Sequence, residues 1–497
     1  MKRLAENTKK WYGSRKRPGR RLKKDDITIV DTDVTKKAVV ATALGNAMEW
    51  FDFGIYSYLA VIIGKVFFSG VTGSLQLVYS FATFAVAFLV RPIGGMFFGM
   101  LGDKFGRKRI LAVTLVLMSL ATLSMGLIPG YAKIGNLAPF LLLVARLVQG
   151  FSTGGEYSGA MTYIAESSPD KKRGFLSSGL EVGTLSGYIL GSGVVTILSF
   201  WLGEDKMLDW GWRLPFFIAA PMGLIGLYLR NRLEETPVFE AMKEGKHKEN
   251  EKGLFRKVFL FHWPQLLKGI VLVLFFNVVD YMLLSYMPSY LSVVLGYGQS
   301  KGLLFILIVM FIMIPIVLIM GYYSDRIGSK RIIMGGLVGL IFLSIPAFKL
   351  IGSGTNLTVF FGLMILAVLL ATFESTMPSM LPSLFFTEVR YVALAIAFNI
   401  SVSLFGGTTP LVMAWLIKTT NNQMVPAYYI MAACLIGVLT MFFVKDTTGK
   451  ALRGSAPAVE EKHEIAKILE DPHEALWWKE EKGNIEEKAS ELENPKN

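Results

Sequence analysis

Apolar runs long enough to cross a membrane recur along most of this chain, and they limit its possible folds more than any other feature. A helix needs about 20 residues to span the hydrocarbon core of a bilayer. Inside lipid the backbone groups must bond to one another, so such runs form helices. Of the 497 residues, 53% are hydrophobic and only 18% are charged. The core of a soluble protein could not bury so many apolar side chains. The sequence therefore predicts an all-α membrane protein.

Twelve segments have the length and apolarity of membrane spans. They lie at residues 38–62, 76–101, 109–129, 138–165, 174–201, 213–230, 265–291, 302–323, 331–351, 357–385, 390–417 and 425–444. The loops between them alternate between clusters of Lys and Arg and isolated lysines. Short basic loops stay in the cytoplasm, so we expect a multi-pass protein of the cytoplasmic (inner) membrane with both termini in the cytoplasm.

A charged segment after the sixth span divides the chain into two halves that echo each other. The loop GDKFGRKR follows the second span and the loop SDRIGSKR follows the eighth, with Asp, Gly and the last Arg at matching positions. A repeated loop in two six-helix halves is typical of secondary transporters. We expect two pseudo-symmetric six-helix bundles, with these parts: a basic cytoplasmic tail 1–37, a first bundle 38–230, a cytoplasmic loop 231–263, a second bundle 264–445 and a cytoplasmic tail 446–497.

The first span carries two carboxylates, Glu49 and Asp52, which share a helical face with Asn46, Phe53 and Tyr56. Carboxylates in an apolar stretch are costly unless they border water or a partner. A buried carboxyl can hold and release a proton near neutral pH, which is what a proton-coupled carrier requires. The alternative is that one of the two only pairs with an arginine.

Further ionisable groups lie in other spans. Arg91 is in the second span, Arg146, Glu156 and Glu181 are in the fourth and fifth, and Asp280 and Glu374 are in the seventh and tenth. Glu156 and Glu181 join Glu49 and Asp52 as candidate proton carriers. The candidate substrate contacts are the polar, acidic and aromatic residues near these groups, because aromatic faces attract quaternary ammonium groups: Asn46, Phe53, Tyr56, Arg91, Tyr157, Asp280, Tyr281, Glu374 and Trp415. Permanent ion pairs and ordinary packing are the alternatives.

The repeated loops predict a conformational latch. Asp103 and Asp325 lie in tight turns beside a helix start, where a carboxylate satisfies free amides and the helix dipole. The basic residues around them can bond the ends of neighbouring helices, and Arg146 can join such a bond. The predicted latch residues are Gly102, Asp103, Gly106, Arg107, Arg109, Arg146, Asp325, Gly328 and Arg331. The alternative is that the basic residues only set topology.

Glycines recur every four residues in the fifth span, at Gly179, Gly183, Gly187 and Gly191. Small residues at this spacing let two helix backbones approach closely. We expect a packing surface there.

Several chemistries have no basis in the sequence. There is no GxxxxGK[ST] loop for ATP, no His/Cys cluster with metal spacing and no paired nucleophile and base, so we expect neither an enzyme nor a cofactor. The single cysteine, Cys434, forms no intrachain disulfide. The net charge of +13 is explained by basic loops, so no nucleic acid partner is predicted.

The loop GDKFGRKR and the segment RLVQGFSTGG resemble motifs of the major facilitator superfamily. GNAMEWFDFGIY, RPIGGMFFG, GGEYSGA, ESSPDKKRGF, DWGWRLPFF and RLEETPVF are similar to the metabolite:proton symporter family within it, and YMLLSYMPSYL and LAIAFNIS to its proline/betaine group. The resemblance covers residues 38 to 450. It implies a twelve-helix major facilitator fold with alternating access and proton-coupled uptake of proline or glycine betaine. The second loop has Ser329 where the first has Arg107, which implies a weaker second latch.

The predicted function is thus a secondary symporter whose partners are a small organic solute, a proton and the lipid bilayer. One alternative is a symporter of organic acids such as citrate or 2-oxoglutarate, for which Arg91 and Arg146 would face the anion. Another is a membrane sensor that transports nothing. Nothing in the sequence indicates an oligomeric state.

Overall fold

The computed structural model describes residues 23–105, 107–232, 257–470, 476–479 and 483. The first half contains these elements: η1 (Lys24–Asp26), β1 (Thr28–Ile29), α2 (Thr32–Tyr58), α3 (Ala60–Phe67), α4 (Gly73–Leu89), α5 (Arg91–Phe105), α6 (Arg107–Leu127), α7 (Tyr131–Ile134), α8 (Leu137–Ser152), α9 (Glu156–Ser167), η2 (Asp170–Lys172), α10 (Arg173–Lys206), η3 (Met207–Gly211) and α11 (Arg213–Arg232). The second half and the tail contain α14 (Trp263–Asp280), η4 (Tyr281–Tyr286), α15 (Met287–Ser289), η5 (Tyr290–Val294), α16 (Gln299–Ile327), α17 (Ser329–Ile351), α18 (Asn356–Ser383), α19 (Arg390–Ser401), η6 (Val402–Gly406), α20 (Thr409–Thr420), α21 (Val425–Phe442), β2 (Ala458–Val459) and α22 (His463–Glu470).

These helices account for the twelve predicted spans. Within the described residues, nine helical stretches are long and apolar enough to cross a membrane, and α2 with α3 makes a tenth, bent by 57°. Two shorter apolar helices, Ala112–Leu127 and Arg213–Ile225, occupy the positions of the third and sixth spans. The twelve-helix, two-bundle architecture is confirmed. The first span differs in detail, because it bends at Leu59 and does not run straight.

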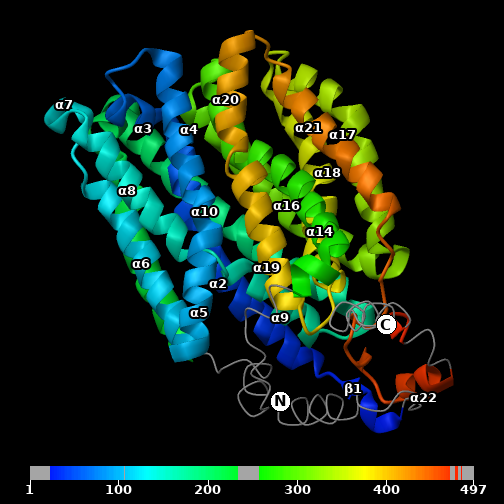
Figure 1. Ribbon diagram of the computed structural model, residues 1–497. Coiled ribbons are helices and arrows are strands. Elements are labelled where there is room, and N and C mark those ends of the chain that lie inside the picture. The colour runs from blue at the N-terminus through cyan, green and yellow to red at the C-terminus, as the bar shows by residue number, and fades with distance from the viewer. Residues whose placement is uncertain (1–22, 106, 233–256, 471–475, 480–482, 484–497) are drawn as a thin grey trace, which may run out of the picture.

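The two bundles stand side by side and meet along two seams. Helix α10 of the first bundle packs on α16 of the second, and α4 packs on α20 (Figure 1). Hydrogen bonds also cross between the halves, from Asn399 Nδ2 to the Gly154 carbonyl at 2.6 Å and from Ser403 Oγ to the Phe88 carbonyl at 2.6 Å. A movement of one bundle against the other must therefore exchange contacts along these seams.

The predicted glycine surface holds α10 against α2. A Cβ added at Gly183 would collide with the Ala43 carbonyl, and one added at Gly187 would collide with the Ala47 carbonyl. Only a residue without a side chain permits this approach of two backbones. The two helices are therefore packed backbone to backbone within the first bundle.

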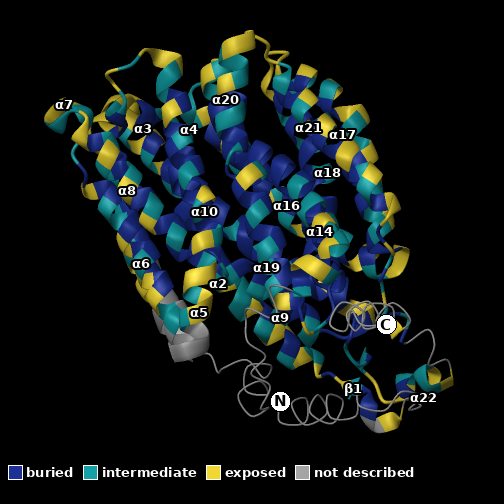
Figure 2. Cartoon of the chain, viewed as in Figure 1, coloured by how far each residue is buried: buried dark blue, intermediate teal, exposed yellow. Residues whose placement is uncertain are grey.

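Burial is distributed as expected for a membrane protein. Exposed apolar side chains lie on the outer surfaces of the helices, including Ile197, Phe342 and Leu357 (Figure 2). Polar and charged side chains lie inside, among them Glu49, Arg146 and Glu374. A soluble protein shows the opposite pattern.

One end of the bundles is covered by the C-terminal segment. There β1 and β2 pair in parallel, with Thr28 opposite Ala458, and α22 lies beside them (Figure 1). We call this end the terminal face, and residues 446–470 the strap. Within the strap, helix α22 begins at His463 and ends at Glu470.

Candidate functional site

An ion pair lies in the interior of the first bundle. Arg91 Nη2 donates to Glu49 Oε1 at 2.6 Å and to the Thr153 carbonyl at 3.2 Å. Both charged side chains are buried, and the guanidinium stacks over the rings of Phe53 and Phe88. Arg91 starts α5 directly after the break at Val90, so it can reach across to α2. The expected carboxylate–arginine pairing is thus present in the structure.

Asp52 belongs to a different network. Thr122 Oγ1 lies 3.2 Å from Asp52 Oδ2 and accepts from Gln149 Nε2 at 2.9 Å, and Gln149 accepts in turn from Arg146. Asp52 is buried with this hydroxyl beside it, and no ion pair to it occurs among the described residues. A buried carboxyl without a cation beside it loses the solvation that favours its charge, and the nearby Glu49 adds like-charge repulsion, so this chain of polar groups suits a group that carries a proton.

The remaining residues of the first-span face mainly hold the bundle together. Asn46 Nδ2 donates to the Leu180 carbonyl at 3.1 Å and to Thr184 Oγ1 at 2.6 Å, which ties α2 to α10. Tyr56 donates to the Ser80 carbonyl at 3.1 Å, and the Arg146 guanidinium lies 4.2 Å from its ring centre.

A third group joins the two halves. Tyr157 donates a hydrogen bond to Glu181, and its ring lies 4.7 Å from that of Phe398 on α19. Asp280 and Glu374, from α14 and α18, interact electrostatically with each other and with Glu181. Four of the predicted residues that the sequence scatters over four spans are therefore brought together between the bundles.

Trp50 is central to this group, although the sequence analysis did not select it. Its ring contacts those of Phe53, Tyr157, Tyr188 and Tyr281, with centroids between 5.2 and 6.4 Å away. Tyr188, Thr122 and Gln149 were missed as well. The available signal for Trp50 was that it directly follows Glu49 in the sequence. The sequence pattern alone, however, cannot distinguish an aromatic residue of a binding site from one that only packs in an apolar helix.

Two predicted residues lie apart from this interior. Trp415 is 53% exposed on α20, and no ring contact links it to the Trp50 group in the described part of the chain. The structure therefore gives no support to Trp415 as a substrate contact, because the buried residues of its helix are Thr409, Pro410, Met413 and Ala414. Glu156, the first residue of α9, is only half-buried and lies near Gly45 of α2.

The second repeated loop makes a contact between the bundles. Asp325, near the end of α16, accepts from the backbone amides of Gly174 at 2.7 Å and Phe175 at 2.8 Å, at the start of α10. A carboxylate at the first turn of a helix is stabilised by the free amides and the dipole. Gly328 separates α16 from α17 with a φ of 109°, a conformation that favours glycine. Asp325 thus closes the α10–α16 seam at the terminal face.

The other predicted latch residues do not join this contact. Arg331 is exposed and donates to the Ile327 carbonyl of its own half, while Arg146 bonds Gln149 and Phe84 in the interior. The first loop lies largely outside the description: Gly106 is not among the described residues, and the side chains of Asp103, Arg107 and Arg109 and the surroundings of Gly102 are not described.

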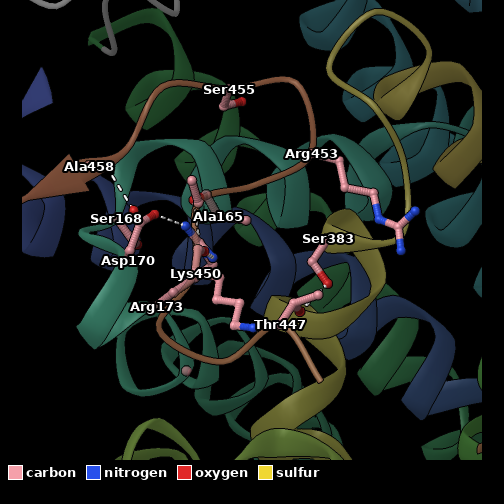
Figure 3. Close-up of polar contacts among 12 residues, drawn as sticks. Ala165, Ser168, Asp170, Arg173, Ser383, Thr447, Lys450, Arg453, Ser455 and Ala458 are labelled. Atoms are coloured by element: carbon pink, nitrogen blue, oxygen red, sulfur yellow. Dashed lines mark hydrogen bonds and ion pairs between the residues drawn. The ribbon is translucent and has the colours of Figure 1, made fainter. Parts of the chain in front are cut away.

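The strap connects both halves at the terminal face. On the first half, Arg173 donates to the Lys450 carbonyl at 2.9 Å, and Asp170 pairs with Arg173 and accepts from the Ala458 amide at 2.9 Å (Figure 3). On the second half, Arg390 donates to the Arg453 carbonyl at 2.8 Å.

Arg390 also reaches back across the seam. It lies 2.5 Å from Glu166 of α9 and is 0% exposed. The cavity enclosed near Asp170, Asp325 and Thr447 has a volume of about 10 Å³, which is room for a single water. The bundles are therefore closed at the terminal face in this structure.

Comparison with known proteins gives one consistent result. A family model described as Major Facilitator Superfamily matches residues 42–407. The chain is 49% identical over 476 residues to the glycine betaine/proline/ectoine/pipecolic acid transporter OusA of Dickeya dadantii, covering 94% of both proteins. It is 47% identical to the proline/betaine transporter of Escherichia coli K12, over 94% of this chain and 93% of that protein. The proton:xylose symporter XylE, 18% identical, shares the fold with a TM-score of 0.66 over 87% of this chain and 99% of that one.

Proposed function

The chain belongs to the major facilitator superfamily, and we propose that it imports a zwitterionic osmoprotectant of the proline or glycine betaine type together with a proton. It is a membrane transporter and not an enzyme. The observation that carries the proposal is the group of buried ionisable side chains at the centre of the two bundles, which a protein of purely structural role would have no reason to keep.

The two carboxylates of α2 take different roles in this proposal. Glu49 stays ionised because it is paired with Arg91 at 2.6 Å. Asp52 takes up and releases the proton, because its neighbour is a hydroxyl and the chain through Gln149 to Arg146 can reorganise as its charge changes. Glu181, which accepts a hydrogen bond from Tyr157 beside the second half, is the second candidate proton carrier.

The terminal face is assigned to the cytoplasm. Lys171, Lys172, Arg173, Arg326 and Arg390 gather there, and basic loops stay on the cytoplasmic side. The closed terminal face then corresponds to a state from which the cell interior is shut off. The Asp325 contact and the strap bias the protein toward this state until the bundles separate.

An organic-acid substrate fits the interior less well. Asp280, Glu374 and Glu181 would repel an anion placed between the bundles. Arg91, the cation expected to receive it, is already paired with Glu49, so its remaining guanidinium nitrogens can donate hydrogen bonds but bring no net positive charge to balance a ligand that carries no cation of its own.

The test is uptake into proteoliposomes containing the full chain. We expect labelled glycine betaine to accumulate when the outside is more acidic than the inside, and a protonophore to abolish the accumulation. Asp52→Asn should lose accumulation while retaining exchange of labelled for unlabelled betaine at equal concentrations. Accumulation that ignores the pH gradient would remove the proton from the scheme, and undiminished accumulation by Asp52→Asn would remove Asp52 from the proton's path.

A further inference from the structure

Several polar atoms between the bundles are buried without a hydrogen-bond partner in the described structure. They are Trp50 Nε1, Tyr281 Oη, both carboxylate oxygens of Glu374, and Nε and Nη1 of Arg91. An unsatisfied buried polar group destabilises the fold, so a set of such groups in neighbouring side chains indicates that a partner arrives from outside the chain.

The unsatisfied atoms are divided by charge. Tyr281 interacts electrostatically with the Arg91 cation and with the Asp280 anion, so it lies between a basic and an acidic side. On the acidic side, Glu374 is 0% exposed, and neither it nor Asp280 or Glu181 forms an ion pair with any described Lys, Arg or His. A ligand that satisfies both sides must carry a cation and an anion.

Aromatic rings pack around Tyr281, the residue that interacts with both sides. Trp50 is 3% exposed and lies 5.2 Å from Tyr188 and 5.9 Å from Tyr281 between ring centroids. The faces of Trp and Tyr attract quaternary and other alkylated ammonium groups, Trp most strongly. Tyr281 begins η4, a π-helical segment, and such segments occur often at functional sites where a helix changes its backbone bonding.

We propose, given that the protein carries a zwitterion as set out above, that Trp50, Tyr281 and Glu374 determine its substrate specificity. The alkylated ammonium lies against the ring of Trp50 and faces Glu374 and Asp280. The carboxylate accepts from Tyr281 Oη and from the unpaired guanidinium nitrogens of Arg91. The ligand thus touches α2 and α5 of the first bundle and η4 and α18 of the second, which couples its binding to their closure.

The test is equilibrium binding to the purified full chain, which does not depend on transport. Glycine betaine is compared with 3,3-dimethylbutanoate, which has the same shape and carboxylate but a neutral carbon in place of the nitrogen. We expect the wild type to prefer betaine at least a hundredfold. Glu374→Gln should reduce this preference at least tenfold, and Trp50→Leu about tenfold to thirtyfold. The matched control Trp415→Leu should leave it unchanged.

Choline tests the other end of the site, because it keeps the trimethylammonium and lacks the carboxylate. Tyr281→Phe should weaken betaine binding about tenfold and leave choline binding as in the wild type. Trp50→Phe keeps a ring and serves if Trp50→Leu does not fold; its betaine preference should fall severalfold.

An unchanged betaine preference in both Glu374→Gln and Trp50→Phe would overturn the inference, and so would a wild type that binds the neutral analogue as well as betaine. Betaine binding with the expected preference but without gradient-driven uptake would support this site and count against the proposed coupling instead.

Discussion

Buried charges occur in two regions of this protein, and the two regions treat them differently. At the terminal face each buried ion has a partner: Asp170 pairs with Arg173, Arg390 with Glu166, and Asp325 with two backbone amides. Between the bundles, Glu374 and Asp280 interact electrostatically with each other, and neither forms an ion pair with a Lys, Arg or His of the described residues. A charge that is satisfied holds structure together, whereas one that is kept unsatisfied is available to a ligand.

The Glu49–Arg91 pair shows that the two regions differ in whether a buried charge has a partner, and not in how deeply the charge is buried. It is as deeply buried as Glu374, yet its two opposite charges are paired with each other. Substitutions should therefore act on stability according to pairing, and four predictions test this.

The largest effect is expected from breaking the Glu49–Arg91 pair. Glu49→Gln leaves the Arg91 cation uncompensated in the interior, which should reduce the free energy of unfolding by about 3–5 kcal/mol. Chemical unfolding in detergent micelles measures this loss. Adding Arg91→Gln to Glu49→Gln should recover part of the stability, and equal stability of wild type and Glu49→Gln would contradict the interpretation of this pair.

A smaller effect is expected at the terminal face. Arg390→Gln removes the bonds to Glu166 and to the strap, and we expect a loss of about 2 kcal/mol in unfolding free energy. It should also open the seam. With Cys434 replaced by serine, a cysteine introduced at buried Ser178 should react faster with a membrane-impermeant maleimide when Arg390 is replaced.

Arg331→Gln is the matched control for this experiment, because Arg331 is exposed and bonds only its own half. Its labelling rate should equal that of the parent protein. A Ser178 cysteine that stays as slow in Arg390→Gln as in the parent would show that Arg390 does not hold the seam.

Substitution of Glu374 should raise the free energy of unfolding, whereas the two substitutions above should lower it. Replacing an unpaired buried carboxyl by an apolar side chain of similar size removes a desolvation cost, so Glu374→Met should raise the unfolding free energy by about 1 kcal/mol. Transport should be lost in the same variant. Stability that falls as in Glu49→Gln would mean that Glu374 has a structural partner after all.

The smallest effect concerns the strap. Hydrogen bonds from Lys172 and Thr32 lower the pKa of Glu460 below its ordinary value of 4.5. A carboxyl with a lowered pKa stabilises the fold at pH values above its unfolded pKa, and this contribution disappears as the pH falls through the folded pKa. Near pH 7 the free energy of unfolding of the wild type should exceed that of Glu460→Gln by about 0.5 kcal/mol. The difference is small because solvent screens the Lys172–Glu460 pair.

Thermal unfolding at several pH values measures this difference, which should shrink below pH 4.5 and vanish once the pH has fallen below the lowered pKa of Glu460. A difference that stays constant over the whole range would rule out ionised Glu460 as its source.

The features that depend on local pattern could be predicted from the sequence. Span length, the two halves and the close contact of α10 with α2 follow from apolar runs and from glycines four residues apart. Buried ionisable residues could also be found, because Glu49, Asp52, Arg91, Asp280 and Glu374 stand out in apolar surroundings.

The features that depend on which side of a helix faces the other bundle could not be predicted. Trp50 and Trp415 look alike in sequence, yet one lies at the centre and the other on the outside. The strap was missed for a related reason: the partners of Glu460 lie hundreds of residues away and that of Arg453 lies 63 residues away, and no local periodicity indicates them.

Helix α10 has two kinds of surface, with different consequences for motion. Its glycine side is locked into the backbone of α2 at Gly183 and Gly187, so the two helices travel as one rigid body. Its other side meets α16 through small hydroxyl and glycine residues, Ser178 against Gly321, which present few protrusions to interlock. A bulky residue on the side that faces α2 would push the two helices of the first bundle apart. A bulky residue on the side that faces α16 would instead block the sliding of one bundle against the other.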